Sequence, residues 1–91
     1  MKTKRFNIEI SDEAEIDFDK SYEYYSEENP KVADFFFRQI NLSLENLKQH
    51  PTSFPIAYKD IRKYVVKKFP FVIYYQVTDS IIRVIANISF K

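Results

Sequence analysis

The side chains best suited to bind an anionic group lie in the last third of the chain. The candidates are four cations and one aromatic ring: Arg62, Lys67, Lys68, Arg83 and Tyr74. The cations can contact phosphate, and the tyrosine can stack on a base or on a partner side chain. Acid–base chemistry also needs a group that exchanges a proton near neutral pH. The one histidine, His50, ends a helical pattern and is expected to interact with the helix dipole, so no acid–base pair is evident.

Each of these cations also has a structural interpretation. Arg62 can form a salt bridge to an acidic residue of the helices, and Lys67 and Lys68 can be solvated side chains at a turn. Charge is divided along the chain: residues 1–50 hold seven basic and eleven acidic side chains, a balance of −4, and residues 51–91 hold seven and two, a balance of +5. A basic sheet could therefore meet an acidic partner, or the lysines could simply protect the sheet edge.

The segment that carries the cations is predicted to be a meander of three antiparallel strands. β-branched and aromatic residues dominate residues 61–88. Thr78-Asp79-Ser80 is a short polar break between two apolar runs, which is typical of a hairpin. Pro70 cannot donate to a strand ladder and therefore places another turn near Lys68. The expected strands cover residues 61–68, 71–77 and 81–88.

Alternation with a period of two predicts the faces of the last two strands. The expected core face carries Phe71, Ile73, Tyr75, Val77, Ile82, Val84, Ala86 and Ile88. The expected outward face carries Val72, Tyr74, Arg83 and Asn87, and any binding by the sheet is sought there. Residues 61–68 do not alternate cleanly, so their faces stay unassigned.

The first half of the chain predicts a strand and two helices. Residues 6–10 alternate, and a helix capped by Ser11 or Asp12 then runs to about Glu28. Asn29-Pro30 ends that helix and begins another, which runs to about Gln49. So short a connection predicts an antiparallel helical hairpin. The order β-α-α-β-β-β predicts one α+β domain over residues 1–91, with the hairpin packed on one face of an antiparallel sheet.

Three consecutive aromatic residues, Phe35-Phe36-Phe37, lie on the second helix. One helical face cannot bury three neighbouring rings, so at least one ring is expected at a groove or interface. The alternatives are contact with a partner, with Phe35 as the candidate residue, self-association into a homodimer, or ordinary burial from the side.

Composition excludes several kinds of site. The chain has no cysteine, which rules out a disulfide and a thiolate metal site, and a single histidine argues against a histidine metal site. No metal or cofactor is expected. No apolar run approaches the roughly 20 residues of a membrane span. Basic residues 1–5 precede an alternating segment rather than a signal-peptide core, so a cytoplasmic location is expected.

Several segments together resemble the RelE/ParE superfamily of bacterial toxins, also called plasmid-stabilisation proteins. The matching features are Ala14, Asp17-Phe18 and Tyr24-Tyr25 in the first helix; Asn29-Pro30, Ala33, Phe36, Ile40, Leu47 and Pro51 around the second; and Ile61-Arg62 followed by residues 68–75, Lys-Phe-Pro-Phe-Val-Ile-Tyr-Tyr. These features cover nearly the whole chain, and their order makes the match specific.

The resemblance implies the toxin of a type II toxin–antitoxin pair, held inactive by a cognate antitoxin that wraps its groove and sheet. RelE-like members cut messenger RNA on the ribosome, whereas ParE-like members are similar to gyrase inhibitors. The nuclease arginine corresponds here to Val72, and the terminal histidine corresponds to Asn87. Neither residue can stabilise a phosphorane or shuttle a proton. The resemblance therefore favours the ParE-like branch, a protein that inhibits a target without being an enzyme.

Two alternatives remain open. One is a ribosome-dependent endoribonuclease that uses Arg62, Lys67, Lys68 and Arg83 as its catalytic residues. The other is a toxin-fold protein without toxic activity that only binds an antitoxin-like peptide or dimerises. Under the favoured interpretation, the expected partner contacts are Arg62, Lys67, Lys68, Tyr74, Arg83, Asn87 and Phe35.

Overall fold

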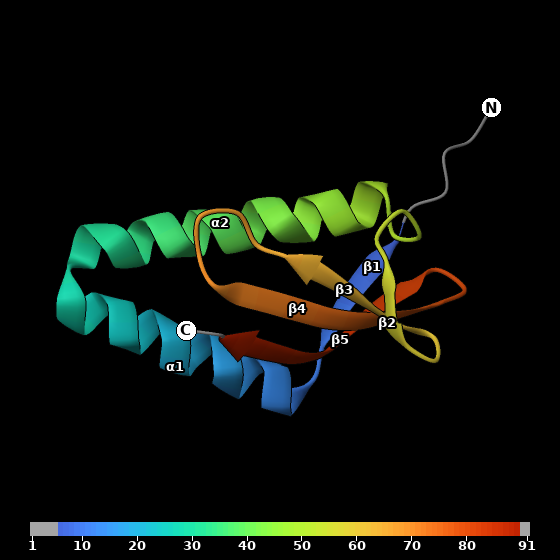
Figure 1. Cartoon of the computed structure of the whole chain (residues 1–91), viewed down its shortest axis with the longest axis horizontal. Helices are drawn as coiled ribbons and strands as arrows, with labels where there is room; N and C mark the ends of the chain where they lie inside the picture. The colour runs from blue at the N-terminus through green and yellow to red at the C-terminus, as the bar shows by residue number, and fades with distance from the viewer. Residues whose placement is uncertain (1–5, 90–91) are drawn as a thin grey trace.

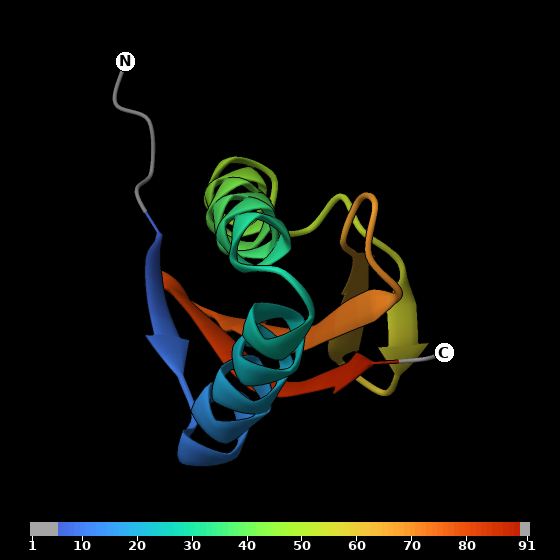
Figure 2. The same cartoon turned by 90° about the vertical axis from the view of Figure 1, so that its left-hand side faces the viewer.

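The computed structural model describes residues 6–89 and arranges them as a helical hairpin against a twisted sheet (Figures 1 and 2). In chain order the elements are β1 (Asn7–Ile10), α1 (Asp12–Glu28), α2 (Pro30–Gln49), β2 (Ile56–Tyr58), β3 (Ile61–Val65), β4 (Phe71–Thr78) and β5 (Ile81–Ser89). The expected two-layer α+β fold is confirmed. The basic segment of residues 1–5, used above for the location, lies outside the described residues.

The sheet has the strand order β1-β5-β4-β3-β2. Strands β2 to β5 form an antiparallel meander, as expected, with β2 as an additional short edge strand. Strand β1 pairs in parallel with β5, so the complete sheet is mixed rather than purely antiparallel. Parallel pairing needs a long connection. Here that connection is the rest of the domain, which carries the chain from β1 through both helices before β5 returns beside it (Figure 1).

Two residues set the geometry of the helical hairpin. Ser11 is the N-cap of α1, and its hydroxyl accepts a hydrogen bond from the Ala14 amide at 3.1 Å. Asn29 ends α1 and begins α2: its amide donates to the Tyr25 carbonyl, and its side chain accepts from the Lys31 amide at 2.9 Å. Asn29 has extended backbone angles, so the chain reverses in one residue. The expected helix limits are confirmed.

A cluster of aromatic rings joins both helices to the sheet. Phe36 lies at its centre, with its ring 5.1 Å from Tyr25, 5.1 Å from Phe69 and 5.2 Å from Phe71. Phe18 of α1 stacks on Phe71 at 5.7 Å. Because these rings come from α1, α2 and the segment that enters β4, their burial fixes how the hairpin sits on the sheet.

A β-bulge in β5 reverses the faces of the last strand. Tyr75 pairs with Val84 and Tyr74 pairs with Ala86, which leaves Ile85 as an extra residue. Before the bulge, Ile82 and Val84 face the core as predicted. After it, alternation is shifted by one residue, so the predicted inward position of Ala86 and Ile88 and the predicted outward position of Asn87 are wrong. The Ser11 hydroxyl donates to the Ile85 carbonyl at 3.1 Å and fastens the bulge to the start of α1.

Lysine and aspartate occupy the turn positions that glycine would ordinarily take. The chain contains no glycine. Lys59, Lys68 and Asp79 have φ values of 51°, 72° and 52°, one in each turn of the meander. A side chain in this left-handed region costs roughly 1–2 kcal/mol, so the meander is held by its strand pairing and core contacts against this local strain.

Candidate functional site

The four candidate cations do not converge on one site. Arg62 pairs with Tyr75, and Arg83 pairs with Gln76. Because Tyr75 and Gln76 are neighbours on β4, the two arginines point to opposite faces of the sheet. Lys67 and Lys68 lie in the turn that precedes β4, at the opposite end of that strand from both arginines.

Arg62 has a structural partner in the loop after α2. Its guanidinium donates to the Phe54 carbonyl at 2.7 Å. Beside it, the Tyr75 hydroxyl is buried and donates to the Pro51 carbonyl at 2.8 Å. Burial raises the pKa of Tyr75 to about 12, although the positive charge of Arg62 acts in the opposite direction. Arg62 and Tyr75 thus hold the loop of residues 50–55 to the sheet, and the hydroxyl stays protonated at neutral pH.

Asn87 is buried beneath α1 and is 4% exposed. Its side-chain amide donates to the Ala14 carbonyl at 2.9 Å, and its backbone amide donates to the Asp17 carboxylate at 3.1 Å. Among the described residues, its Oδ1 atom has no hydrogen-bond donor. The prediction that Asn87 stands on the outward face is therefore wrong, because it was based on uninterrupted alternation through the bulge.

Val72 lies on the face opposite the helices, as predicted, but it is not free. The residue is 8% exposed, and its partners on the neighbouring strands are Val65 and Ile88. Val72 and Asn87 therefore occupy opposite faces, not one shared surface. A working surface that contains both residues does not exist in this fold.

The face of the sheet away from the helices, here called the open sheet face, carries mixed side chains. By the strand register, its residues include Tyr58, Lys63, Val65, Val72, Tyr74, Gln76, Arg83, Ala86 and Ile88. Tyr58, Val65 and Ile88 are more than half exposed, and Tyr74 is half-buried. Of the predicted contacts, this face brings together Tyr74 and Arg83. Lys63 and Tyr58 were missed, since β3 does not alternate cleanly and β2 was not predicted as a strand.

One depression lies between the two helices and β1, and we call it the hairpin groove. It measures about 530 Å³ and is lined by Ile10, Glu15, Phe18, Asp19, Tyr22, Asp34, Phe36, Phe37, Ile40, Asn41 and Leu44. Phe37 projects into it with 57% of its surface exposed, and its ring meets the edge of Tyr22 at 6.3 Å. The groove therefore has an apolar floor and open aromatic side chains.

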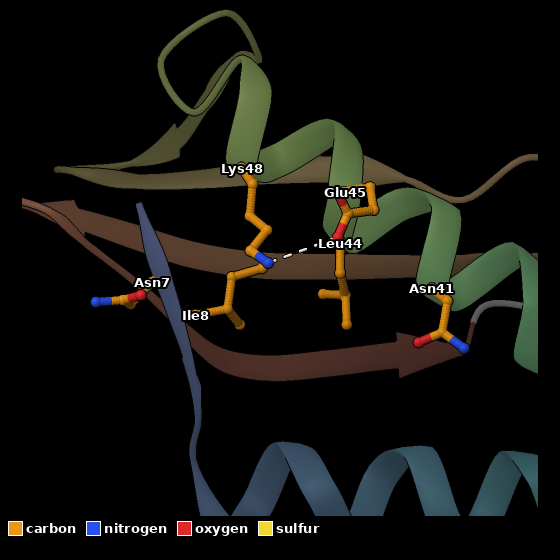
Figure 3. Close-up of a pocket in the computed structure, with 6 residues that line it drawn as sticks. All are labelled: Asn7, Ile8, Asn41, Leu44, Glu45 and Lys48. Atoms are coloured by element: carbon orange, nitrogen blue, oxygen red, sulfur yellow. Dashed lines mark ion pairs between the residues drawn. The ribbon is translucent and has the colours of Figure 1, made fainter. Parts of the chain in front are cut away.

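A second depression, of about 540 Å³, continues the groove along α2 toward β1. Asn41 and Leu44 line both depressions. Figure 3 shows Leu44 of α2 and Ile8 of β1 facing each other across it. At its end, the Lys48 ammonium pairs with the Glu45 carboxylate at 3.5 Å. The two depressions form one trough that follows α2 for most of its length.

The three neighbouring phenylalanines differ in exposure, as the helical period requires. Phe36 is buried, Phe37 is exposed in the groove, and Phe35 is half-buried with its ring 5.6 Å from Phe69. The prediction that at least one ring reaches a groove is confirmed. The ring that does so is Phe37, whereas Phe35, the residue chosen from the sequence, packs at the edge of the core.

Neither metal binding nor membrane insertion gains support from the geometry. Within residues 6–89, no three His, Asp or Glu side chains are grouped closely enough to hold a metal ion. No helix in the same range is long and apolar enough to cross a membrane.

Comparison with known proteins supplies the family. Residues 8–89 match the model of the family described as ParE toxin of type II toxin–antitoxin system, parDE. Among solved structures, one titled "Chromosomal ParDE TA system from P. aeruginosa" superposes with a TM-score of 0.83 at 17% identity, covering 98% of this chain and 100% of that chain. At that identity the superposition shows the shared fold alone. A search of curated proteins finds no match. Since the family model covers nearly the whole chain, the protein belongs to the ParE toxin family of type II toxin–antitoxin systems.

Proposed function

We propose that this toxin acts in the bacterial cytoplasm by binding and inhibiting a protein target, DNA gyrase, and that a cognate antitoxin neutralises it. Membership of the ParE family supports this over RNA cleavage. The observation that carries the proposal is the scatter of the candidate nuclease cations over both faces and both ends of the sheet. Cleavage of RNA needs a base, an acid and a cation around one phosphate, and these residues do not surround a common point.

The open sheet face is the proposed site of target binding. Tyr74, Lys63 and Arg83 provide an aromatic ring and two cations beside exposed apolar side chains. Aromatic residues and arginine at the centre of a patch often contribute most of the binding energy in protein interfaces. No helix of the described chain covers this face, so a folded target can reach it (Figure 2).

The hairpin groove is the proposed site of antitoxin binding. Its exposed apolar side chains, Phe37 and Tyr22, lie in a concave surface where a partner helix could bury them. Helix-in-groove binding uses anchors of this kind, spaced by one helical turn.

The decisive experiment compares two activities of the purified chain. Gyrase supercoiling of relaxed plasmid should be blocked, while primer extension on ribosome-bound message should show no new cuts. Arg83→Glu and Tyr74→Ala should each weaken gyrase inhibition by about tenfold. Lys20→Ala, an exposed change on α1 outside both surfaces, is the matched control and should inhibit like the parent chain.

Three results would contradict the proposal. Codon-specific cuts in the message would assign the chain to the ribosome-dependent nucleases. Normal growth of cells that express the chain without its partner gene would identify a binding protein without toxic activity. Unchanged gyrase inhibition by both open-face variants would remove that face from target binding.

A further inference from the structure

The hairpin groove carries negative charge, a property that does not follow from membership of the ParE family. Glu15 and Asp19 of α1 and Asp34 of α2 line it, and all three carboxylates are exposed. Lysine and arginine are absent from the lining of this depression; the nearest cation of the trough is Lys48 at its far end. The walls of the groove are therefore acidic over an apolar floor.

These carboxylates are not neutralised within the described chain. The one ion pair found in residues 6–89 joins Lys48 to Glu45. Arg38 lies four residues after Asp34, a spacing that favours a helical ion pair, yet the two side chains form none within 4.0 Å. The negative charge of the groove is thus available to a ligand.

The dimensions of the trough define the form of the ligand. From Asp34 to Lys48, α2 rises about 21 Å at 1.5 Å per residue. A helix of about 14 residues would match this length and could place apolar anchors on Phe37 and Leu44, seven residues apart on α2. An extended peptide would fill the same length with fewer residues but would present alternate side chains to solvent.

We propose that the groove binds a basic amphipathic helix of the antitoxin, with its apolar stripe on Phe37 and Leu44 and its lysines or arginines beside Asp19 and Asp34. The inference rests on the proposed neutralisation by an antitoxin and adds the chemistry of the binding segment. The basic residues of that helix face the hairpin groove rather than the far end of the trough, because the three carboxylates line the groove and the Lys48–Glu45 pair lies at the far end.

The test uses three fluorescent 14-residue helix-forming peptides and the purified full chain. The first has leucines at helical spacing with lysines beside them, the second keeps the leucines and replaces lysine with glutamate, and the third keeps the lysines and replaces leucine with serine. Fluorescence anisotropy should show the lysine–leucine peptide binding at least about tenfold tighter than either other peptide at low salt. Its advantage over the glutamate peptide should shrink to about threefold at 0.3 M salt, because exposed charges are screened.

Matched variants locate the binding site. Phe37→Ala should weaken binding of the lysine–leucine peptide about tenfold, while Leu42→Ala should not, although Leu42 is equally exposed on α2 outside the groove. Asp19→Asn combined with Asp34→Asn should reduce the preference for lysine over glutamate to about threefold or less at low salt, because Glu15 alone of the lining carboxylates remains. Glu23→Gln, an exposed neutralisation on α1 away from the lining, should leave that preference unchanged. Thermal unfolding of each variant checks that the fold is intact.

Defined outcomes would overturn the inference. These are equal or tighter binding of the glutamate peptide at low salt, equal effects of Phe37→Ala and Leu42→Ala, or a dimer of the chain that Phe37→Ala converts to monomer. The last result would assign the groove to a second copy. A chain that arrests growth but rejects the lysine–leucine peptide overturns this inference alone. A chain that binds the peptide but never arrests growth overturns the proposed function alone.

Discussion

The two faces of the sheet carry similar apolar and aromatic residues but expose them to different extents. On the helix-facing side, Phe71, Ile73 and Tyr75 are buried under the hairpin. On the open side, Tyr74 of the same strand is half-buried, and Val65 of the neighbouring strand β3 is mostly exposed. The covered face supplies stability through close packing, and the open face keeps apolar and cationic side chains available for binding. Substitutions on the two faces should therefore separate folding from function.

The largest expected effect comes from removing a ring that covers the sheet. Phe36→Ala should lower the free energy of unfolding by about 3–5 kcal/mol, because it leaves a cavity among Tyr25, Phe69 and Phe71. Val65→Ala, on the open face, should lower it by less than about 1 kcal/mol. Urea unfolding followed by circular dichroism measures both. Equal losses would contradict the division of roles between the faces.

The next effect is a pH dependence specific to the covered face. Burial raises the pKa of Tyr75 from 10.0 to about 12. The folded state therefore holds the hydroxyl proton more tightly than the unfolded state, and it is stabilised while the hydroxyl is protonated. This contribution is complete below pH 10 and is lost as the pH rises toward 12, a loss of about 2–3 kcal/mol at 1.36 kcal/mol per pKa unit. Urea unfolding between pH 8 and pH 11.5 should show it.

Tyr74, the neighbour of Tyr75 on the open sheet face, provides the control. Tyr74→Phe should keep the alkaline loss, whereas Tyr75→Phe should remove it. At pH 7, Tyr75→Phe should instead cost about 1 kcal/mol, because the Pro51 carbonyl loses its hydrogen-bond donor. Lysine titration contributes equally to both variants, so the difference between them isolates the buried hydroxyl. The same alkaline loss in both variants would show that another group is responsible.

A smaller effect is expected at Asn87, a polar residue buried on the covered face. Asn87→Ala should cost about 1–2 kcal/mol, because the hydrogen bond to the Ala14 carbonyl is lost and a small void forms beneath α1. Ser89→Ala, an exposed change two residues later on β5, should be nearly neutral. A neutral Asn87→Ala in urea unfolding would contradict the burial of this residue after the bulge.

The smallest effect concerns the turn that joins β3 to β4. Lys68→Gly should raise the free energy of unfolding by about 0.5–1 kcal/mol, because glycine adopts the positive φ of this position without strain. Lys67→Gly should lower it, since Lys67 does not have a positive φ. Differential scanning calorimetry should resolve the opposite signs. A gain from both substitutions would show that the turn as a whole, and not one residue, is strained.

The limits of sequence interpretation are clearest on β5. Alternation correctly placed Ile82 and Val84 in the core, but it failed at Asn87 because one extra residue, Ile85, exchanges the faces. No local signal marks that bulge in a chain without glycine. The Ser11 hydroxyl that bonds the Ile85 carbonyl comes from 74 residues earlier, a contact that no local pattern reveals.

The candidate site likewise combines a feature that the sequence predicts with features that depend on tertiary contacts. An exposed ring among Phe35, Phe36 and Phe37 was predictable, because the helical period cannot bury three neighbours. Which ring is exposed depended on how α2 rotates against Phe69 and Phe71, a tertiary contact. The acidic groove could not be predicted either, since it combines Asp19 and Asp34 from two helices whose relative position is set by packing.

The sequence by itself determined the elements, their order and the family resemblance. Helix caps, prolines and hydrophobic periods are local, and each acts within a few residues. Only the tertiary structure decided the parallel pairing of β1 with β5, the burial of Asn87 and the groove that exposes Phe37. These features depend on contacts between segments far apart in the chain, where close packing selects one arrangement among several that the local patterns allow.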